Sequence, residues 1–330
     1  MRKIAPMLLA AAALIAAPSL AAQEAPAPAP AHADTRPEAT AGIGPGARPV
    51  GAQWSRSPVI APHGMAATAH PLATQIALDI LKAGGSAVDA AIAANAALGL
   101  MEPTGNGIGG DLFAIILDPA SGELVGLNGS GRSPGGQTLA QLKAKLPEGA
   151  TSLPPVGPLP VTIPGTVDAW FDMHARYGKL PMAEVLAPAI RYAREGHPIA
   201  PVIAMYLERG LKNYERQQKA MPFEFDNARK VWFADGSAPK PGALFRNADL
   251  ANTLEAIAKG GRDAFYKGQL AKVMVDYLQR QGSAFTLADF AAHESTWVDV
   301  ACVAYRKGYE LCELPPNSQG FAALQMVNIL

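Results

Sequence analysis

The segment from Ser86 to Leu117 constrains the fold of this chain more than any other stretch. Residues 87–101 consist mostly of Ala, Val, Ile and Leu, which predicts a helix that starts after a Ser86 cap, with Asp89 as the acid of a capping box. A helix that is apolar all round is buried all round. Residues 112–117 form a short apolar run that indicates a buried strand. Other elements must therefore cover both.

Residues 105–110, between these two elements, have the glycine spacing G-x-G-x-x-G. In dinucleotide-binding sites this spacing follows a strand and opens a helix. Here a helix comes first and a strand follows, so the context argues against a nucleotide site. We expect a turn instead, in which the glycines supply positive φ angles and close packing.

Helices and turns alternate along the rest of the chain, which holds 32 glycines and 29 prolines in 330 residues, unlike a helical bundle. Apolar periodicity predicts helices at residues 71–83, 166–177, 182–195, 249–259, 270–281, 287–292 and 321–330. Residues 123–127 are expected to return as a second strand after a turn at 118–122. Asn247 and Thr286 are predicted helix caps, and Gly260–Gly261 a helix end.

The first 21 residues have the features of a signal peptide. A basic start precedes an apolar stretch at residues 7–17 and a small-x-small cleavage site at Ser19–Ala21. The alternative is a membrane anchor, but a spanning helix needs about 20 apolar residues, and Pro18 interrupts this run. We expect cleavage, no membrane span afterwards, and export to a periplasm or to the medium.

Residues 22–56 form a Pro/Ala-rich segment that is predicted to be a flexible leader, because it can bury too little apolar surface to offset its ordering entropy. Residues 57–330 are expected to be globular. The 28 basic and 28 acidic residues of the chain cancel. This balance gives no basic face for nucleic acid.

The two cysteines, Cys302 and Cys312, flank a predicted hairpin that turns at Arg306–Gly308. A three-residue loop would place them opposite each other, close enough for a disulfide, and export permits one. Two buried thiols on facing strands are the open alternative. Zinc is not expected, since a tetrahedral site wants more Cys or His ligands at close spacing.

Several longer motifs carry a resemblance to a known family. They are G64-M-A-A-T-A-H-P-L-A-T, L127-N-G-S-G-R-S-P, V161-T-I-P-G-T-V, F245-R-N-A-D-L-A-N-T-L and L314-P-P-N-S-Q-G. In order and spacing the chain resembles the γ-glutamyltranspeptidase family over residues 57–330, and it looks closer to a transpeptidase-like branch that includes cephalosporin-acylase-like and oxamate-amidohydrolase-like members.

The resemblance implies an α+β fold, the four-layer αββα sandwich of N-terminal-nucleophile hydrolases, of which this chain would hold only the large-subunit part. Family members cleave themselves ahead of a threonine whose new α-amine activates its own hydroxyl. No Thr-Thr-His-like motif occurs here. We therefore expect no catalytic residue in this chain, no metal or cofactor, and a downstream small subunit from the same precursor as its partner.

The resemblance also points to a substrate-binding wall at Asn128, Ser130 and Arg132. In transpeptidases proper an arginine that binds the substrate α-carboxylate occupies the position of Ser130, whereas here the next arginine is Arg132. Two interpretations stay open: Arg132 reaches the same pocket, or it is a structural surface arginine. For residues 314–320, capping of the last helix by Asn317 or Ser318 is favoured over a pocket wall.

The activity implied by the resemblance is that of a γ-glutamyltransferase or glutathione hydrolase, which cleaves γ-glutamyl or related amides through an acyl-enzyme. One alternative is a transpeptidase-like acylase, of the cephalosporin-acylase or oxamate-amidohydrolase kind. The other is a catalytically empty exported binding protein.

Overall fold

The computed structural model describes residues 59–220 and 223–330, which belong to a single unit, Pro58–Leu330. The predicted signal peptide (1–21) and leader (22–56) lie outside the described residues, so both stay predictions. In the part of the chain that is described, no helix is both long and apolar enough to cross a bilayer.

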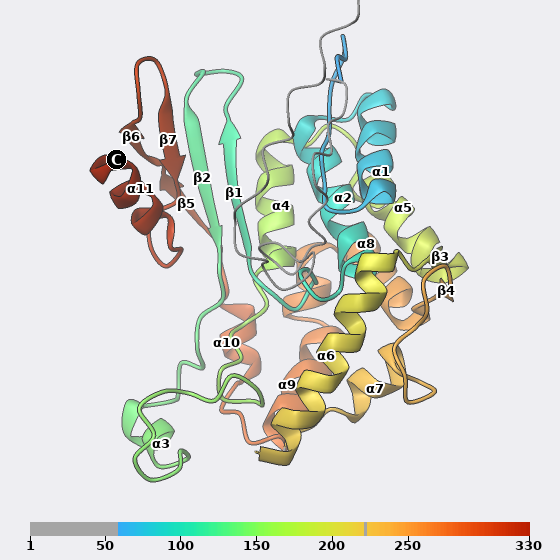
Figure 1. The fold of residues 1–330 in the computed structure, drawn as a ribbon, viewed down its shortest axis with the longest axis vertical. Coiled ribbons are helices and arrows are strands. Elements are labelled where there is room, and N and C mark those ends of the chain that lie inside the picture. Colours follow the sequence, from blue (N-terminus) through green and yellow to red (C-terminus); the bar gives the residue numbers. More distant parts are fainter. Residues whose placement is uncertain (1–58, 221–222) are drawn as a thin grey trace, which may run out of the picture. The chain divides into compact units, whose positions relative to one another are not determined.

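Helices make up most of the regular secondary structure of the described chain (Figure 1). The main helical layer contains α1 (Pro71–Lys82), α2 (Ala87–Met101), α4 (Thr166–Tyr177), α5 (Met182–Glu195), α8 (Ala248–Tyr266) and α9 (Gln269–Arg280). As predicted, α2 is buried along its length, and α1, α4 and α5 all pack against it. Its alanines, which have the smallest side chains after glycine, let these three helices approach closely.

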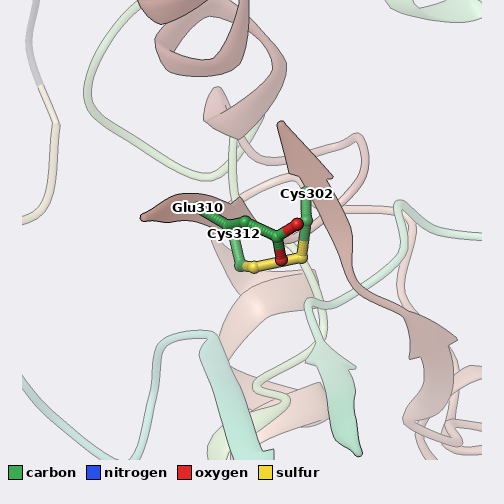
Figure 2. Close-up of side chains that lie close together, drawn as sticks. All are labelled: Cys302, Glu310 and Cys312. Carbon is green, nitrogen blue, oxygen red and sulfur yellow. A yellow bond between two sulfur atoms is a disulfide. The ribbon is translucent and has the colours of Figure 1, made fainter. Parts of the chain in front are cut away.

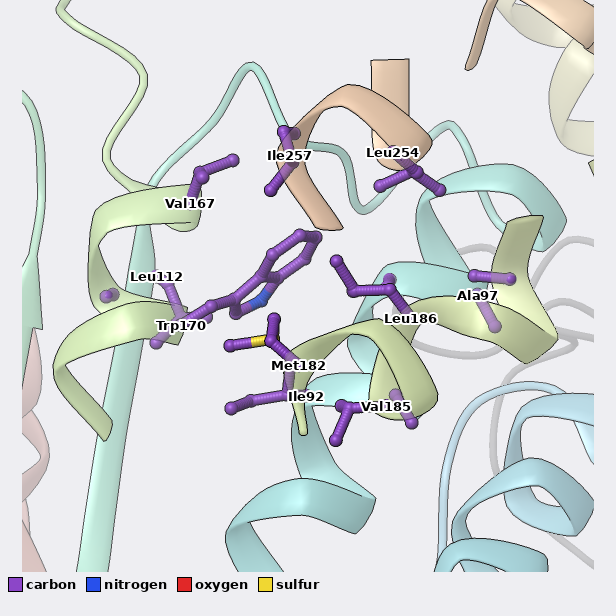
Figure 3. Close-up of a cluster of buried hydrophobic side chains, with 14 of the residues drawn as sticks. Ile92, Ala97, Leu112, Val167, Trp170, Met182, Val185, Leu186, Leu254 and Ile257 are labelled. Carbon is purple, nitrogen blue, oxygen red and sulfur yellow. The ribbon is translucent and has the colours of Figure 1, made fainter. Parts of the chain in front are cut away.

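The indole of Trp170 lies at the centre of this layer (Figure 3). Residues of three neighbouring helices surround it, and among them are Ile92, Met182, Leu186, Leu254 and Ile257. The ring donates its single N–H to Asn95 Oδ1 at 2.9 Å. A buried indole needs such a partner for its donor, and this one orients α4 against α2.

One antiparallel sheet, in the order β1-β2-β5, lies beside the helices. It consists of β1 (Leu112–Leu117), β2 (Leu124–Gly129) and β5 (Thr296–Asp299). The inner face packs on α4, and Leu112 and Leu127 are buried there. Alternate residues of β1 point the other way, and Phe113, Ile115 and Leu117 are 41%, 40% and 63% exposed. The outer face of this sheet is therefore apolar and uncovered along β1, whereas Leu314 and Asn317 contact it at Gly126 and Asn128 of β2.

The chain then forms a hairpin of β6 (Ala301–Ala304) and β7 (Glu310–Glu313), followed by α11 (Gly320–Ile329). The turn at Arg306–Gly308 is confirmed, with Arg306 at φ 55° and Gly308 at φ 85°. Cys302 faces Cys312 in the β6–β7 register, and the two form a disulfide (Figure 2). The alternative of two buried free thiols is thereby ruled out.

Several elements were not predicted from the sequence. They are the short helices α3 (Leu139–Lys143) and α7 (Asp226–Trp232), the long helix α6 (Pro201–Ala220), the paired strands β3 (His197–Pro198) and β4 (Leu244–Phe245), and β5. A second hydrophobic core joins α6 to the aromatic residues Phe225 and Phe233. The predicted short helix after Thr286 is present as α10 (Leu287–Ala291).

Three predicted caps are confirmed, and a fourth is present in part. The side chains of Ser86, Asn247 and Thr286 each accept a hydrogen bond from the first turn of their helix. The last helix begins after Gln319, whose side chain makes no capping bond, but the Ser318 hydroxyl oxygen accepts the N–H of Gly320, the first helical residue, at 3.3 Å. The same hydroxyl donates to the Leu314 carbonyl at 2.9 Å.

The glycine predictions are confirmed only in part. Residues 105–110 do turn the chain from α2 into β1, yet none of these glycines has a positive φ. The expected close packing is absent as well, since a Cβ on Gly105, Gly107, Gly109 or Gly110 would meet no atom nearer than 3.5 Å. The Gly110 carbonyl anchors the turn by accepting the N–H groups of Gly165 at 2.9 Å and Thr166 at 3.0 Å. The helix end predicted at Gly260–Gly261 is confirmed by the non-helical backbone of Gly261, where φ is 67°, and a second helical segment of α8 follows up to Tyr266.

The mixed α+β composition is confirmed. Four layers are not: residues 59–220 and 223–330 provide helices against one face of a three-stranded sheet, plus two small two-stranded sheets. The αββα sandwich therefore stays a proposal for the whole protein.

Candidate substrate-binding site

The predicted site residues lie where the chain leaves β2. Asn128 is the next-to-last residue of β2, and its Oδ1 accepts the backbone N–H of Ser130 at 3.0 Å. The next N–H, of Gly131, donates to Asp111 Oδ1 at 3.0 Å. The Arg132 carbonyl accepts the N–H of Ile163 at 3.0 Å. Each residue of this loop is thus held by a bond to a different neighbour, which gives it one conformation.

Asn317 joins this loop from the far end of the chain. Asn128 Nδ2 donates to Asn317 Oδ1 at 2.9 Å, and Ser130 Oγ donates to the same oxygen at 3.2 Å. The structure therefore brings two predicted site residues together with a residue for which we favoured a capping role. The pocket-wall interpretation of the 314–320 loop accounts for these contacts.

Arg132 differs from its neighbours in its surroundings. Its side chain is exposed and makes no ion pair with any described residue. A guanidinium offers a planar fork of donors that matches a carboxylate. Arg132 therefore carries unused binding capacity beside Asn128 and Ser130, and the structure leaves both interpretations of this residue open.

A buried polar network, missed in the sequence, lies under the loop. Asp168 of α4 is 1% exposed. Its Oδ2 accepts both the N–H and the hydroxyl of Ser295 at 2.6 Å. Arg262 donates from Nε to Asp168 Oδ1 and from Nη2 to the His293 carbonyl. The only available signal in the sequence was an acid within the otherwise apolar start of α4, since its partners are 94 and 127 residues away.

Tyr266 and His293 complete the network. Tyr266 donates its hydroxyl to the Pro164 carbonyl at 2.6 Å and accepts the N–H of Asp168 at 3.0 Å. Its ring stacks on His293 with centroids 5.4 Å apart. Burial lowers the pKa of His293, although Asp168 acts in the opposite direction, and burial raises the pKa of Tyr266. Both side chains are therefore neutral at pH 7.

Two glycines, Gly129 and Gly165, allow the backbone at the end of β2 and the backbone at the start of α4 to approach each other closely. A Cβ on Gly165 would lie 1.9 Å from the Gly129 carbonyl oxygen and 3.4 Å from His293 Nε2. A Cβ on Gly129 would lie 2.7 Å from Ala169 Cβ. Close backbone approach at these positions excludes any side chain. The end of β2 is thus pressed against the start of α4 and held there by the buried polar groups.

The described residues contain one group of three potential metal-binding side chains, Cys302, Glu310 and Cys312 (Figure 2). Both sulfurs are used in the disulfide. A disulfide lacks the thiolates that bind zinc. This cluster is therefore not a zinc site in the bonded form.

The structure defines a mixed α+β scaffold in which helices cover one face of an antiparallel sheet and a strand ends in a polar loop beside an exposed arginine. The model of the family described as γ-glutamyltranspeptidase matches residues 73–330. The chain belongs to the γ-glutamyltranspeptidase family.

Three similar proteins illustrate the relationship. The "Glutathione hydrolase-like YwrD proenzyme" of Bacillus subtilis is 38% identical over 82% of this chain and 49% of its own length. The "Oxamate amidohydrolase proenzyme" of Klebsiella pneumoniae is 34% identical over 82% and 49%. The solved cephalosporin acylase of Bacillus halodurans is 40% identical, with a TM-score of 0.73, over 84% of this chain and 52% of that one. The chain thus spans about half the length of the curated relatives it matches.

Proposed function

We propose that this chain is the large-subunit part of an amidohydrolase that cleaves γ-glutamyl or related amides through an acyl-enzyme. The observation that carries the proposal is the loop after β2. There Arg132, exposed and without an ion pair in the described structure, stands beside Asn128 and Ser130, which Asn317 holds in place. In this proposal Arg132 binds a substrate carboxylate through two parallel hydrogen bonds, and Asn128 and Ser130 form the neighbouring wall.

The nucleophile in this mechanism is an N-terminal threonine of a downstream small subunit, cut from the same precursor. Its α-amine takes the proton of its own hydroxyl, and the hydroxyl oxygen attacks the amide carbon. Backbone N–H groups hold the resulting oxyanion. The amine leaves with a proton, and water or an acceptor amine then cleaves the acyl-enzyme. The printed proenzyme names of the relatives support such a precursor.

The uncovered face of the sheet supports the same partner. Phe113, Ile115 and Leu117 of β1 project from it side by side. Contiguous exposed apolar side chains of this kind mark an interface. We infer that the downstream subunit contributes a second sheet to this face and its own helices beyond it, which would complete the four layers.

The second candidate function is that of a transpeptidase-like acylase. The observation that favours it is Ser130, which occupies the position of the carboxylate-binding arginine in transpeptidases proper. The printed names of two similar proteins, an oxamate amidohydrolase and a cephalosporin acylase, also support it. In this candidate the donor has a carboxylate but needs no α-amine.

Three p-nitroanilides tested on the complete, processed protein separate these functions. γ-Glutamyl-p-nitroanilide carries an α-amine and an α-carboxylate, glutaryl-p-nitroanilide has only the carboxylate, and butyryl-p-nitroanilide has neither. Preference for the first supports a transpeptidase, and preference for the second supports an acylase. Equal turnover of all three would contradict a carboxylate-binding role for Arg132, and turnover of none would contradict both candidates.

Export is part of the proposal, with residues 1–21 as signal peptide and 22–56 as leader. N-terminal sequencing of the protein from a periplasmic or medium fraction tests it. We expect a mature chain that begins at residue 22. An intact Met1 on protein from the cytoplasm would contradict export.

A further inference from the structure

A cavity of about 590 Å³ lies in the second core, away from the loop after β2. It is open to solvent on one side and is lined by residues of α6, α7, α9 and the segment at residues 155–161. Six aromatic side chains line it: Tyr214, Phe223, Phe225, Trp232, Phe233 and Tyr277. None of its lining residues belongs to the candidate substrate-binding site. Its volume lies in the range of small-molecule sites, about 300–1,000 Å³.

Glu224 places a carboxylate in this aromatic lining. Its Oε2 accepts the Tyr277 hydroxyl, and its Oε1 accepts the N–H of Asn227 at 3.0 Å. Partial burial acts to raise the pKa of Glu224, but these hydrogen bonds outweigh it and hold the pKa below its ordinary value. The group is therefore ionised at neutral pH, and Oε2, with the Tyr277 hydroxyl as its one described donor, can accept a further hydrogen bond.

No described cation forms an ion pair with Glu224. Lys230 is exposed and contributes only at longer range. Arg229, which is closer in sequence, pairs with Glu215 at 3.2 Å and lies over the Phe225 ring, 4.8 Å from its centroid. A negative charge among aromatic faces is thus left without a counter-ion in the described structure.

We propose that this cavity is a binding site for a small aromatic amine in its ammonium form. The ammonium would donate to Glu224, and the aromatic body would stack against the ring-lined wall. Aromatic faces also attract cations through their quadrupole, most strongly where water is excluded. A neutral aromatic ligand would leave the carboxylate unpaired, and an anionic ligand would be repelled by it.

Tryptamine is the probe, titrated into the complete protein by calorimetry at low salt. We expect saturable binding with one site per chain. Indole-3-acetate has the same ring and the opposite charge, and it should bind at least about tenfold more weakly. Failure of tryptamine to bind at millimolar concentration, or equal binding of the two compounds, would overturn the proposal.

Glu224→Gln removes the charge and keeps an amide oxygen that can accept from Tyr277. It should weaken tryptamine binding at least about tenfold. The matched control is Glu208→Gln on α6, which pairs with Lys212 at the exposed surface and does not line the cavity. Equal affinities of Glu224→Gln and the wild type would contradict the role of the carboxylate.

Gly210→Leu tests the cavity itself without harming the fold. Gly210 lines the cavity from the interior of α6, and an added Cβ would meet only the Tyr214 ring edge, at 4.0 Å. Leucine favours a helix over glycine by about 1 kcal/mol, so the thermal midpoint should not fall. Tryptamine binding should be lost because the side chain fills the space. Undiminished binding by this variant would place the ligand elsewhere. Amidase activity is not the readout, so the proposed function can fail independently.

Discussion

Two arginines, both close to the end of β2, have opposite surroundings. Arg262 is held by a buried carboxylate and a backbone carbonyl. Arg132 is exposed and unpaired among the described residues. Removing one partner from a buried pair leaves a charge without compensation, whereas removing an exposed charge costs the fold little. The comparison assigns Arg262 to the scaffold, while binding of substrate by Arg132 stays a proposal, and the predictions below test both.

The largest expected effect is on the buried pair. Asp168→Ala should lower the free energy of unfolding by about 3–5 kcal/mol, because Arg262 and Ser295 lose their shared acceptor. Urea denaturation measures it. The control is Asp263→Ala, whose carboxylate lies at the surface beside Arg262 and Lys267 and should matter by less than about 1 kcal/mol. Similar losses for the two variants would break the distinction between buried and exposed charges.

A buried histidine whose ring has no hydrogen-bond partner in the described structure extends the comparison. His197 is fully buried, and neither ring nitrogen has a hydrogen-bond partner among the described residues. Burial, aided by the neighbouring His70, lowers the pKa of His197 to about 4. The unfolded chain binds a proton below about pH 6.5, while the folded chain resists it until about pH 4. Stability should therefore fall as the pH drops through this window, by up to roughly 3 kcal/mol at 1.36 kcal/mol per unit.

Urea denaturation at pH 7 and pH 5 checks this expectation against His197→Phe. The variant keeps a ring of similar size beside Phe245 and has no proton to bind. It should lose less stability than the wild type between the two pH values. Parallel losses in the two proteins would mean that other groups cause the pH dependence.

Arg132→Ala tests the exposed member of the comparison. Its stability should stay within about 0.5 kcal/mol of the wild type. In the complete enzyme, kcat/KM for the preferred carboxylate-bearing anilide should fall about 30- to 160-fold, as expected for a lost charge-assisted pair worth about 2–3 kcal/mol. Turnover of butyryl-p-nitroanilide should not change. Arg209→Ala, at an exposed arginine of α6, serves as the control. An unaltered kcat/KM for Arg132→Ala would make this residue structural.

The smallest effect is expected at Asn317. It separates positioning of the loop after β2 from direct binding by Arg132. Asn317→Ala removes the oxygen shared by Asn128 and Ser130. Because the site is exposed, stability should change by about 1 kcal/mol or less, while kcat/KM should fall about fivefold through looser positioning. Gln325→Ala, exposed on α11, is the control. Equal kinetics of the two variants would leave Asn317 without a positioning role.

Local sequence signals predicted the elements whose stability depends on local groups. Ser86 with Asp89 and Thr286 with Asp289 are capping boxes, in which both partners lie within one turn. The Cys302–Cys312 hairpin was predictable for the same reason, since a short loop sets the register of its strands. The helix α6 was missed even though Ile203, Leu207 and Leu211 have helical spacing and Pro222 is a stop signal in the sequence, because its second half is polar.

The chain's own residues thus determined the family, the buried helix α2 and the composition of the loop after β2, because motif order, apolar periodicity and caps are properties of neighbours in sequence. Tertiary structure alone decided that Asn317 meets Ser130, 187 residues earlier, and that Asp168 meets Arg262, 94 residues later. The sequence around a hydrogen-bonding side chain does not indicate which distant residue will be its partner. Their pairing appears only when packing of the whole chain brings the two backbone segments close together.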